Sequence, residues 1–225
     1  MPLPTYFPDP ETVSGNVASE KHRPRVQFLR RVCIGHCAAN LITAGLSIQL
    51  VSFAQIGQAA ALFIVSLAAL TLQRRFLDKG LLGVSLSVAL AVPTVVFLAI
   101  VWGHLRSLGL PVDVIVPISL AIGVYSALCG NDFSYWGQLT LSYLVCLGFL
   151  IFMFRSGDMS VTQAIGGACL GFVYLFYFSY DLSMIVKRRR IGEELSGVVD
   201  FYRDLVNFVT YSVRVYLHWK RFRFI

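Results

Sequence analysis

Seven apolar stretches, separated by short polar connections, follow one another through almost the whole chain. The hydrocarbon core of a bilayer is about 30 Å thick, and an α-helix needs about 20 residues to cross it. Only 14% of the 225 residues are charged, whereas soluble domains carry about 25%. The sequence therefore predicts an all-α membrane protein with seven transmembrane helices. We expect these helices at residues 30–53, 56–74, 81–103, 112–130, 135–154, 161–186 and 195–219.

The last stretch, Leu195 to Trp219, is long enough to cross a bilayer and yet carries four charged residues. A charged side chain that faces lipid at mid-depth costs several kcal/mol, so a lipid-exposed helix would not carry four of them. At helical spacing the polar residues gather roughly on one side, and valine and leucine occupy the other. We therefore expect six helices to surround a polar carboxyl-terminal helix; the alternative is an amphipathic helix on the membrane surface. The four charged residues are Asp200, Arg203, Asp204 and Arg214.

The chain divides into three parts: an amino-terminal tail, a transmembrane domain and a carboxyl-terminal tail. Residues 1–27 are polar, rich in proline and without periodicity, so we expect a disordered cytosolic tail. Residues 28–219 form the seven-helix transmembrane domain, and residues 220–225 form a basic carboxyl-terminal tail. The five cysteines all fall in apolar stretches, which argues against a disulfide framework.

The distribution of basic residues predicts how the chain is oriented. Arginine and lysine cluster before the first stretch, in the loop 75–80 and in the loop 187–194, while the other connections are nearly neutral. Because cytosolic loops of membrane proteins are enriched in these residues, we expect the N-terminus and both loops in the cytosol. The basic residues after position 219 do not fit a seventh full crossing, so the side of the C-terminus stays open.

Two aspartates lie in the last two apolar stretches, where a carboxylate is costly. Asp181 is near the end of the sixth stretch, and Asp204 is about two to three turns into the last. If the chain turns back between them, the carboxylates can approach, share one proton and form a pH-sensitive cation site near Arg74. In the alternative interpretation, Asp181 and Arg74 lie in interfacial water and Arg203 neutralises Asp204.

Short motifs surround both aspartates. Tyr180 precedes Asp181, and residues 201–208 read Phe-Tyr-Arg-Asp-Leu-Val-Asn-Phe. They resemble the Tyr-Asp motif and the Leu-Tyr-x-Asp-x-x-Asn-Leu-Phe motif of the Bax inhibitor or lifeguard family of membrane proteins. Residues 28–32, Phe-Leu-Arg-Arg-Val, are similar to that family's entry to the first span, and Arg74 matches its basic position after the second. The middle stretches are similar only as apolar helices.

The resemblance implies a seven-helix fold in which six helices surround the last one. It also implies a pH-sensitive calcium leak from endoplasmic reticulum or Golgi stores, and inhibition of apoptosis through lower stored calcium. Calcium would be a transported ion and not a cofactor, and the chain would not be an enzyme. Its surroundings would be the lipid bilayer, its partners would include cell-death regulators, and no nucleic acid would bind. Divergent relatives of this kind occur in large DNA viruses.

The resemblance also assigns roles to individual residues. Asp181 and Asp204 would form the proton-sharing pair, and Arg74 would hold the closed state. Five further side chains would support this ion pathway: Tyr180, Tyr202, Asn207, Asp200 and Arg203.

Other function classes fit parts of the sequence. A regulator without a pore, which binds cell-death or immune proteins, predicts the same residues. A seven-helix receptor fits the number of stretches, but the chain lacks a lumenal cysteine pair and a long ligand loop. An intramembrane aspartyl protease is disfavoured because Asp204 follows Tyr-Arg and not the Gly-x-Gly of that class.

Two smaller patterns predict packing. Gly167 and Gly171 have the GxxxG spacing that allows close contact between helices. His36 lies between Cys33 and Cys37, and all three fall within about one helical turn, where they point in different directions. We therefore interpret these three as packing residues rather than metal ligands.

Overall fold

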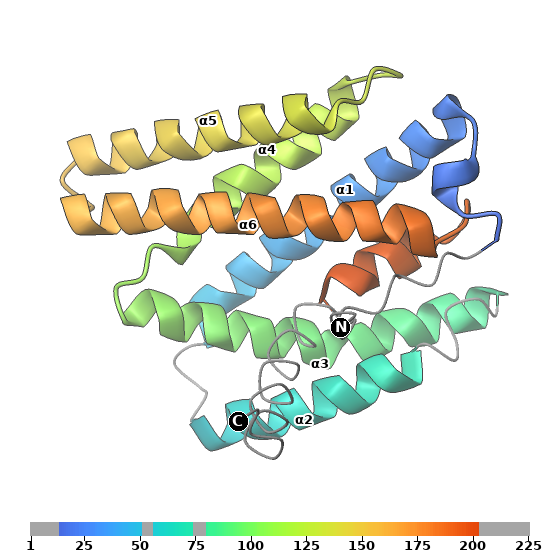
Figure 1. Ribbon diagram of the computed structural model, residues 1–225. Helices are drawn as coiled ribbons and strands as arrows, with labels where there is room; N and C mark the ends of the chain where they lie inside the picture. Colours follow the sequence, from blue (N-terminus) through green and yellow to red (C-terminus); the bar gives the residue numbers. More distant parts are fainter. Residues whose placement is uncertain (1–13, 51–55, 74–79, 203–225) are drawn as a thin grey trace, which may run out of the picture.

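The computed structural model describes residues 14–50, 56–73 and 80–202, most of which are helical (Figure 1). None of these residues forms a strand, so the prediction of an all-α protein is confirmed for this part of the chain. A further helical run covers residues 194–202, at the start of the predicted last helix. The elements before it are η1 (Val17–Ser19), α1 (His22–Leu50), α2 (Ile56–Gln73), α3 (Gly80–Ser107), η2 (Val112–Val114), α4 (Ile115–Leu128), α5 (Tyr135–Arg155) and α6 (Val161–Arg188).

Within the described parts of the chain, three helices, α1, α5 and α6, are long and apolar enough to cross a membrane. Their outer faces carry large apolar side chains that water would hydrate poorly and that lipid would cover. Ile42 of α1, Phe152 of α5 and Phe176 of α6 are 57%, 68% and 71% exposed. The described helices are thus those of a membrane-integrated protein.

The helices alternate in direction, so their connections collect at two ends of the bundle (Figure 1). α1 packs against α3 and α4, α2 packs against α3, and α4, α5 and α6 pack in succession. At one end, hydrogen bonds join the amino-terminal segment to the α4–α5 connection and to the residue that follows α6. His22 Nε2 lies 2.7 Å from the carbonyl oxygen of Asn131, and the Val17 N–H donates to the carbonyl of Arg189. The amino-terminal segment and the basic 187–194 loop therefore lie at the same end.

The prediction of a disordered tail over residues 1–27 is wrong from residue 14 onward, because residues 14–27 form η1 and the first turns of α1. Val17 is fully buried in the core, and the Asn16 side chain caps η1 by accepting from the Ser19 N–H at 3.0 Å. Pro24 stands in the first turn of α1, where backbone N–H groups have no intrahelical partner and proline is tolerated. Residues 1–13 lie outside the described residues.

Arg30 of α1 caps the carboxyl end of α4. Its guanidinium donates to the carbonyl oxygens of Ser126, Ala127 and Gly130 at 2.8, 2.9 and 3.3 Å. The last carbonyls of a helix lack intrahelical donors and form the negative end of its dipole, so a cation there is favourable. An arginine from the basic cluster before the first apolar stretch thus joins two helices.

Gly167 and Gly171 bring α6 close to α5 and to the η2–α4 region, as the GxxxG spacing predicts. A Cβ atom at Gly167 would lie 2.7 Å from Leu150 Cδ2, and one at Gly171 would lie 2.7 Å from Cys146 Sγ. Such distances are shorter than real Cβ contacts, so only glycine fits this close approach without a shift of α5 or α6.

We expect Gly171→Ala to destabilise the protein by about 1–3 kcal/mol, because the added methyl group overpacks the contact with Cys146. Gly148→Ala on α5 is the matched control, since a Cβ there would meet nothing within 4 Å. Thermal unfolding of the purified protein in detergent measures both changes. Equal melting temperatures for the two variants would contradict the close α5–α6 contact.

Candidate functional site

The helical run 194–202 turns back into the bundle after α6 and lies beside α1 and α6 (Figure 1). Gly192 forms the turn, with a φ of 95° that favours glycine. Asp200 and Phe201 are 0% and 2% exposed, and Tyr202 is 9% exposed. The described start of the last helix is therefore buried, which favours the buried helix over a helix on the membrane surface.

Asp200 forms a buried ion pair with Arg189. The Arg189 Nε and Nη2 atoms donate to the two carboxylate oxygens at 2.7 and 2.9 Å, in the bidentate geometry that gives strong, directional contacts. The side chain of Arg189 is only 16% exposed and also lies 3.9 Å from Glu193. Asp200, one of the predicted supporting residues, thus joins the last helical run to the end of α6.

Asp181 lies in α6 and is 2% exposed, which places its carboxyl group inside the bundle and away from surface water. Its neighbour Tyr180 is 53% exposed and faces outward. Of the predicted residues, Asp181, Asp200 and Tyr202 are therefore buried near the junction of α6 with the last helical run, and Tyr180 does not join them. Four others lie outside the described residues: Arg74, Arg203, Asp204 and Asn207.

The most extensive polar contacts in this region belong to a cluster in which only Tyr202 was a predicted site residue. Asn40 Nδ2 lies 2.9 Å from Ser119 Oγ, 2.7 Å from the Tyr174 hydroxyl and 3.1 Å from His36 Nε2. The Tyr202 hydroxyl donates to Asn40 Oδ1 at 3.1 Å. We refer to these five side chains, from α1, α4, α6 and the last helical run, as the polar cluster: His36, Asn40, Ser119, Tyr174 and Tyr202.

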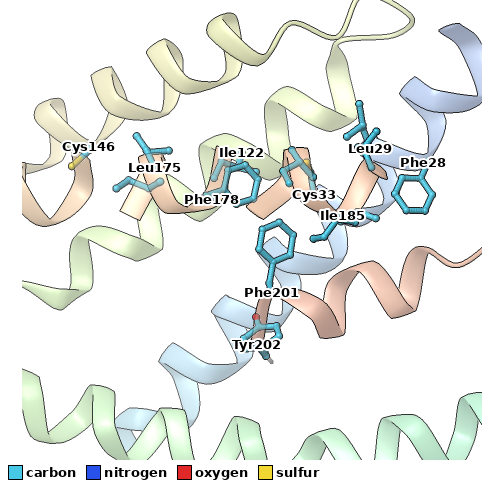
Figure 2. Packing of buried hydrophobic residues seen from close by; sticks show 14 of the residues in the cluster. Phe28, Leu29, Cys33, Ile122, Cys146, Leu175, Phe178, Ile185, Phe201 and Tyr202 are labelled. Atoms are coloured by element: carbon cyan, nitrogen blue, oxygen red, sulfur yellow. The ribbon is translucent and has the colours of Figure 1, made fainter. Parts of the chain in front are cut away.

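Two aromatic rings pack against His36 of the polar cluster. The Phe201 and Phe178 rings are stacked with centroids 5.2 Å apart and an angle of 4° between their planes. The His36 ring lies 4.3 Å from Phe201 and 5.2 Å from Phe178. Figure 2 shows Phe201 directed from the last helical run toward Phe178 of α6. We call Phe178 and Phe201 the aromatic stack.

His36 packs against aromatic rings, as predicted, and its Nε2 atom also belongs to the polar cluster. Its cysteine neighbours pack as well. Cys37 Sγ occupies the space where a Cβ of Gly123 would otherwise stand, and Cys33 is fully buried. One sequence pattern could have predicted the polar cluster: His36 and Asn40 are four positions apart in an apolar stretch and so share one helical face. Within the described ranges, no three His, Cys, Asp or Glu side chains gather as they would to hold a metal ion.

Comparisons of the chain with protein-family models, curated proteins and solved structures found no match. The resemblance to the Bax inhibitor family therefore stays a prediction that rests on the motifs around Asp181 and Asp204.

We expect Arg189→Gln to destabilise the protein by about 3–5 kcal/mol, because it leaves the carboxylate of Asp200 buried without its charge partner. Arg31→Gln is the matched control, since Arg31 pairs with Glu194 of the same helical run but is 68% exposed. Exposed pairs contribute at most about 1 kcal/mol. Unfolding in detergent compares the two variants, and similar losses would show that the Arg189–Asp200 pair is not an internal contact.

Proposed function

We propose that this chain is a pH-sensitive calcium leak of intracellular stores, and that it inhibits apoptosis by lowering stored calcium. One observation carries most of the argument: Asp181 is an ionisable side chain that is almost fully buried in an apolar, membrane-length helix. Carboxylates in such helices are rare, and they mark pathways for ions or protons because their burial is otherwise unfavourable.

The last helical run supports the proposal. It enters the bundle beside α6, and Asp204 follows Asp200 by four positions, the spacing of residues on one helical face. A second carboxylate near Asp181 would allow the two to share a proton at neutral pH and keep the pathway closed. Loss of that proton would leave two carboxylate groups, which are the oxygen ligands that Ca²⁺ prefers. In this proposal Arg74 holds the closed state.

The distribution of charge supports one orientation. The amino-terminal segment and the 187–194 loop lie at the same end of the bundle and carry many of the basic residues. We propose that this end faces the cytosol, in the membrane of the endoplasmic reticulum or Golgi apparatus. Cell-death regulators in the cytosol would then meet the basic end of the protein.

The test is calcium flux through liposomes that contain only the purified protein, measured over a range of pH. We expect Asp181→Asn and Asp204→Asn each to remove most of the pH dependence, because each removes one member of the proton-sharing pair. Asp200→Asn should have a smaller effect, since that carboxylate is already bound by Arg189.

Asp132→Asn is the control, because Asp132 is exposed in the α4–α5 connection. An unchanged pH profile in both the Asp181 and Asp204 variants would contradict the paired-carboxylate mechanism. If the wild-type protein carried no calcium, the proposed leak would be wrong and a regulator without a pore would be the better account.

A further inference from the structure

We infer that the ion pathway continues past Asp181 along a polar stripe on α1, and that the aromatic stack closes it. This inference rests on the proposed function, because it names the residues that line and close the same pathway. It concerns side chains that the family resemblance does not assign: the stripe consists of His36, Asn40, Thr43 and Ser47.

The stripe is continuous along one buried face of α1. Its members are spaced by four, three and four positions, which keeps them on one side of a helix. They are 5%, 8%, 2% and 0% exposed, respectively. The opposite side of α1 carries apolar side chains such as Ile42, which is 57% exposed. From His36 to Ser47, α1 thus turns a stripe of polar residues inward and apolar residues such as Ile42 outward, the reverse of a helix in a soluble protein.

The stripe begins near the middle of the helices that would cross the membrane. His36 is the fifteenth of the 29 residues of α1, and Tyr174 is the fourteenth of the 28 residues of α6. Their side chains meet at 2.8 Å, so this contact lies near mid-depth if both helices span the bilayer. Polar groups at that depth are unfavourable and are found mainly where helices contact each other or where a pathway crosses.

Two features favour a pathway over helix contact alone. Thr43 and Ser47 donate their hydroxyl protons to the carbonyls of Ala39 and Ala44, which leaves their hydroxyl oxygens able to accept or to coordinate. His36 is 5% exposed, and its Nδ1 atom makes no hydrogen bond within the described residues. A cluster that served only to join helices would satisfy its buried polar atoms.

Along α6, Phe178 of the aromatic stack lies between Asp181 and Tyr174, which contacts His36 of the stripe. Phe178 is three residues before Asp181 and four after Tyr174 in α6, which corresponds to about 5 Å in each direction along the helix axis. Phe201 from the last helical run is directed toward Phe178 (Figure 2) and contacts His36 as well, with ring centroids 5.2 Å and 4.3 Å away. A cation that passed Asp181 would meet these two rings before it reached the oxygen atoms of the stripe.

The contacts of Tyr202 connect this closure to the last helical run. Tyr202 adjoins Phe201 in the chain, and its hydroxyl occupies Asn40 Oδ1 at 3.1 Å. A movement of the run that withdraws Phe201 would also break this hydrogen bond and free the amide oxygen of Asn40. That oxygen could then bind Ca²⁺, a hard cation that prefers oxygen ligands. The described arrangement is therefore a closed state.

The first test is calcium flux in proteoliposomes. Thr43→Val keeps the shape of the side chain but removes the oxygen, and it should lower flux about threefold; Asn40→Leu should lower it about tenfold. Thr140→Val on the exposed face of α5 is the matched control and should leave flux unchanged. A flux in Thr43→Val equal to that of the control would overturn the inference.

The second test does not require calcium transport. Ser47→Cys is treated with a small cationic, membrane-impermeant thiol reagent, and labelling is quantified by mass spectrometry on the peptide that carries residue 47. Combining it with Phe178→Ala should raise the labelling rate about tenfold, because the larger opening lowers the barrier to entry. Phe176→Ala is the matched control, since Phe176 lies two residues away and is 71% exposed, whereas Phe178 is 1% exposed.

Phe178→Leu provides a second variant that keeps an apolar side chain but removes the aromatic stack, in case the alanine variant does not fold. Equal labelling with changes at 178 and at 176 would overturn the inference. Faster labelling of residue 47 in the Phe178 variants, found together with absence of calcium flux in the wild-type protein, would support the polar pathway and refute the calcium leak. The two proposals can therefore fail separately.

Discussion

A carboxylate that is completely buried needs a charge partner, and this requirement fixes the end of the described bundle. Asp200 is held by the two guanidinium donors of Arg189, so the last helical run can enter the interior only where Arg189 reaches it. The backbone carbonyl of the same arginine accepts the N–H of Val17, whose side chain is fully buried. One residue thus joins the end of α6, the amino-terminal segment and the run that leads toward Asp204.

From that junction inward, polar and apolar contacts alternate. Along α6, Asp181 is followed by Phe178 of the aromatic stack, and Phe178 by Tyr174, which contacts Asn40 of the polar cluster. In lipid, an unsatisfied polar group cannot turn to water, so each of these groups must find a partner within the protein or a transported species. The succession favours a bundle whose apolar core encloses a set of buried polar groups, with further apolar helix faces left for the bilayer. This physical pattern connects the fold with the proposed leak.

Much of the helix pattern could be predicted from the sequence because the length and apolar character of a membrane helix are local properties. α5 begins at the predicted residue and ends one residue beyond the predicted limit, and α6 extends two residues beyond its predicted end. α1 begins eight residues earlier than expected, at His22 and not at residue 30, because charged residues and Pro24 in its first turns concealed the helix. The burial of Val17 was equally hidden within a proline-rich segment.

The partners within the site could not be predicted, since they depend on which helices adjoin. Arg189 stands in a run of four basic residues, Lys187 to Arg190, and nothing in that run distinguishes the residue that binds Asp200 from the other three. Asn40 contacts residues 119, 174 and 202, which are far away in the chain. Asp181, in contrast, was predictable as a site candidate, because an aspartate in an apolar stretch is conspicuous without knowledge of its neighbours.

The most direct test of the account is a double-mutant cycle between Tyr202→Phe and Asn40→Leu, read as unfolding free energy in detergent. The account holds that the last helical run is fixed inside the bundle by the hydrogen bond between these side chains. It predicts a coupling energy of about 0.6 kcal/mol or more, the size measured for hydrogen bonds between helices in membrane proteins. Losses that add to within about 0.3 kcal/mol would show that the two side chains act independently, and would contradict a buried last helix joined to α1.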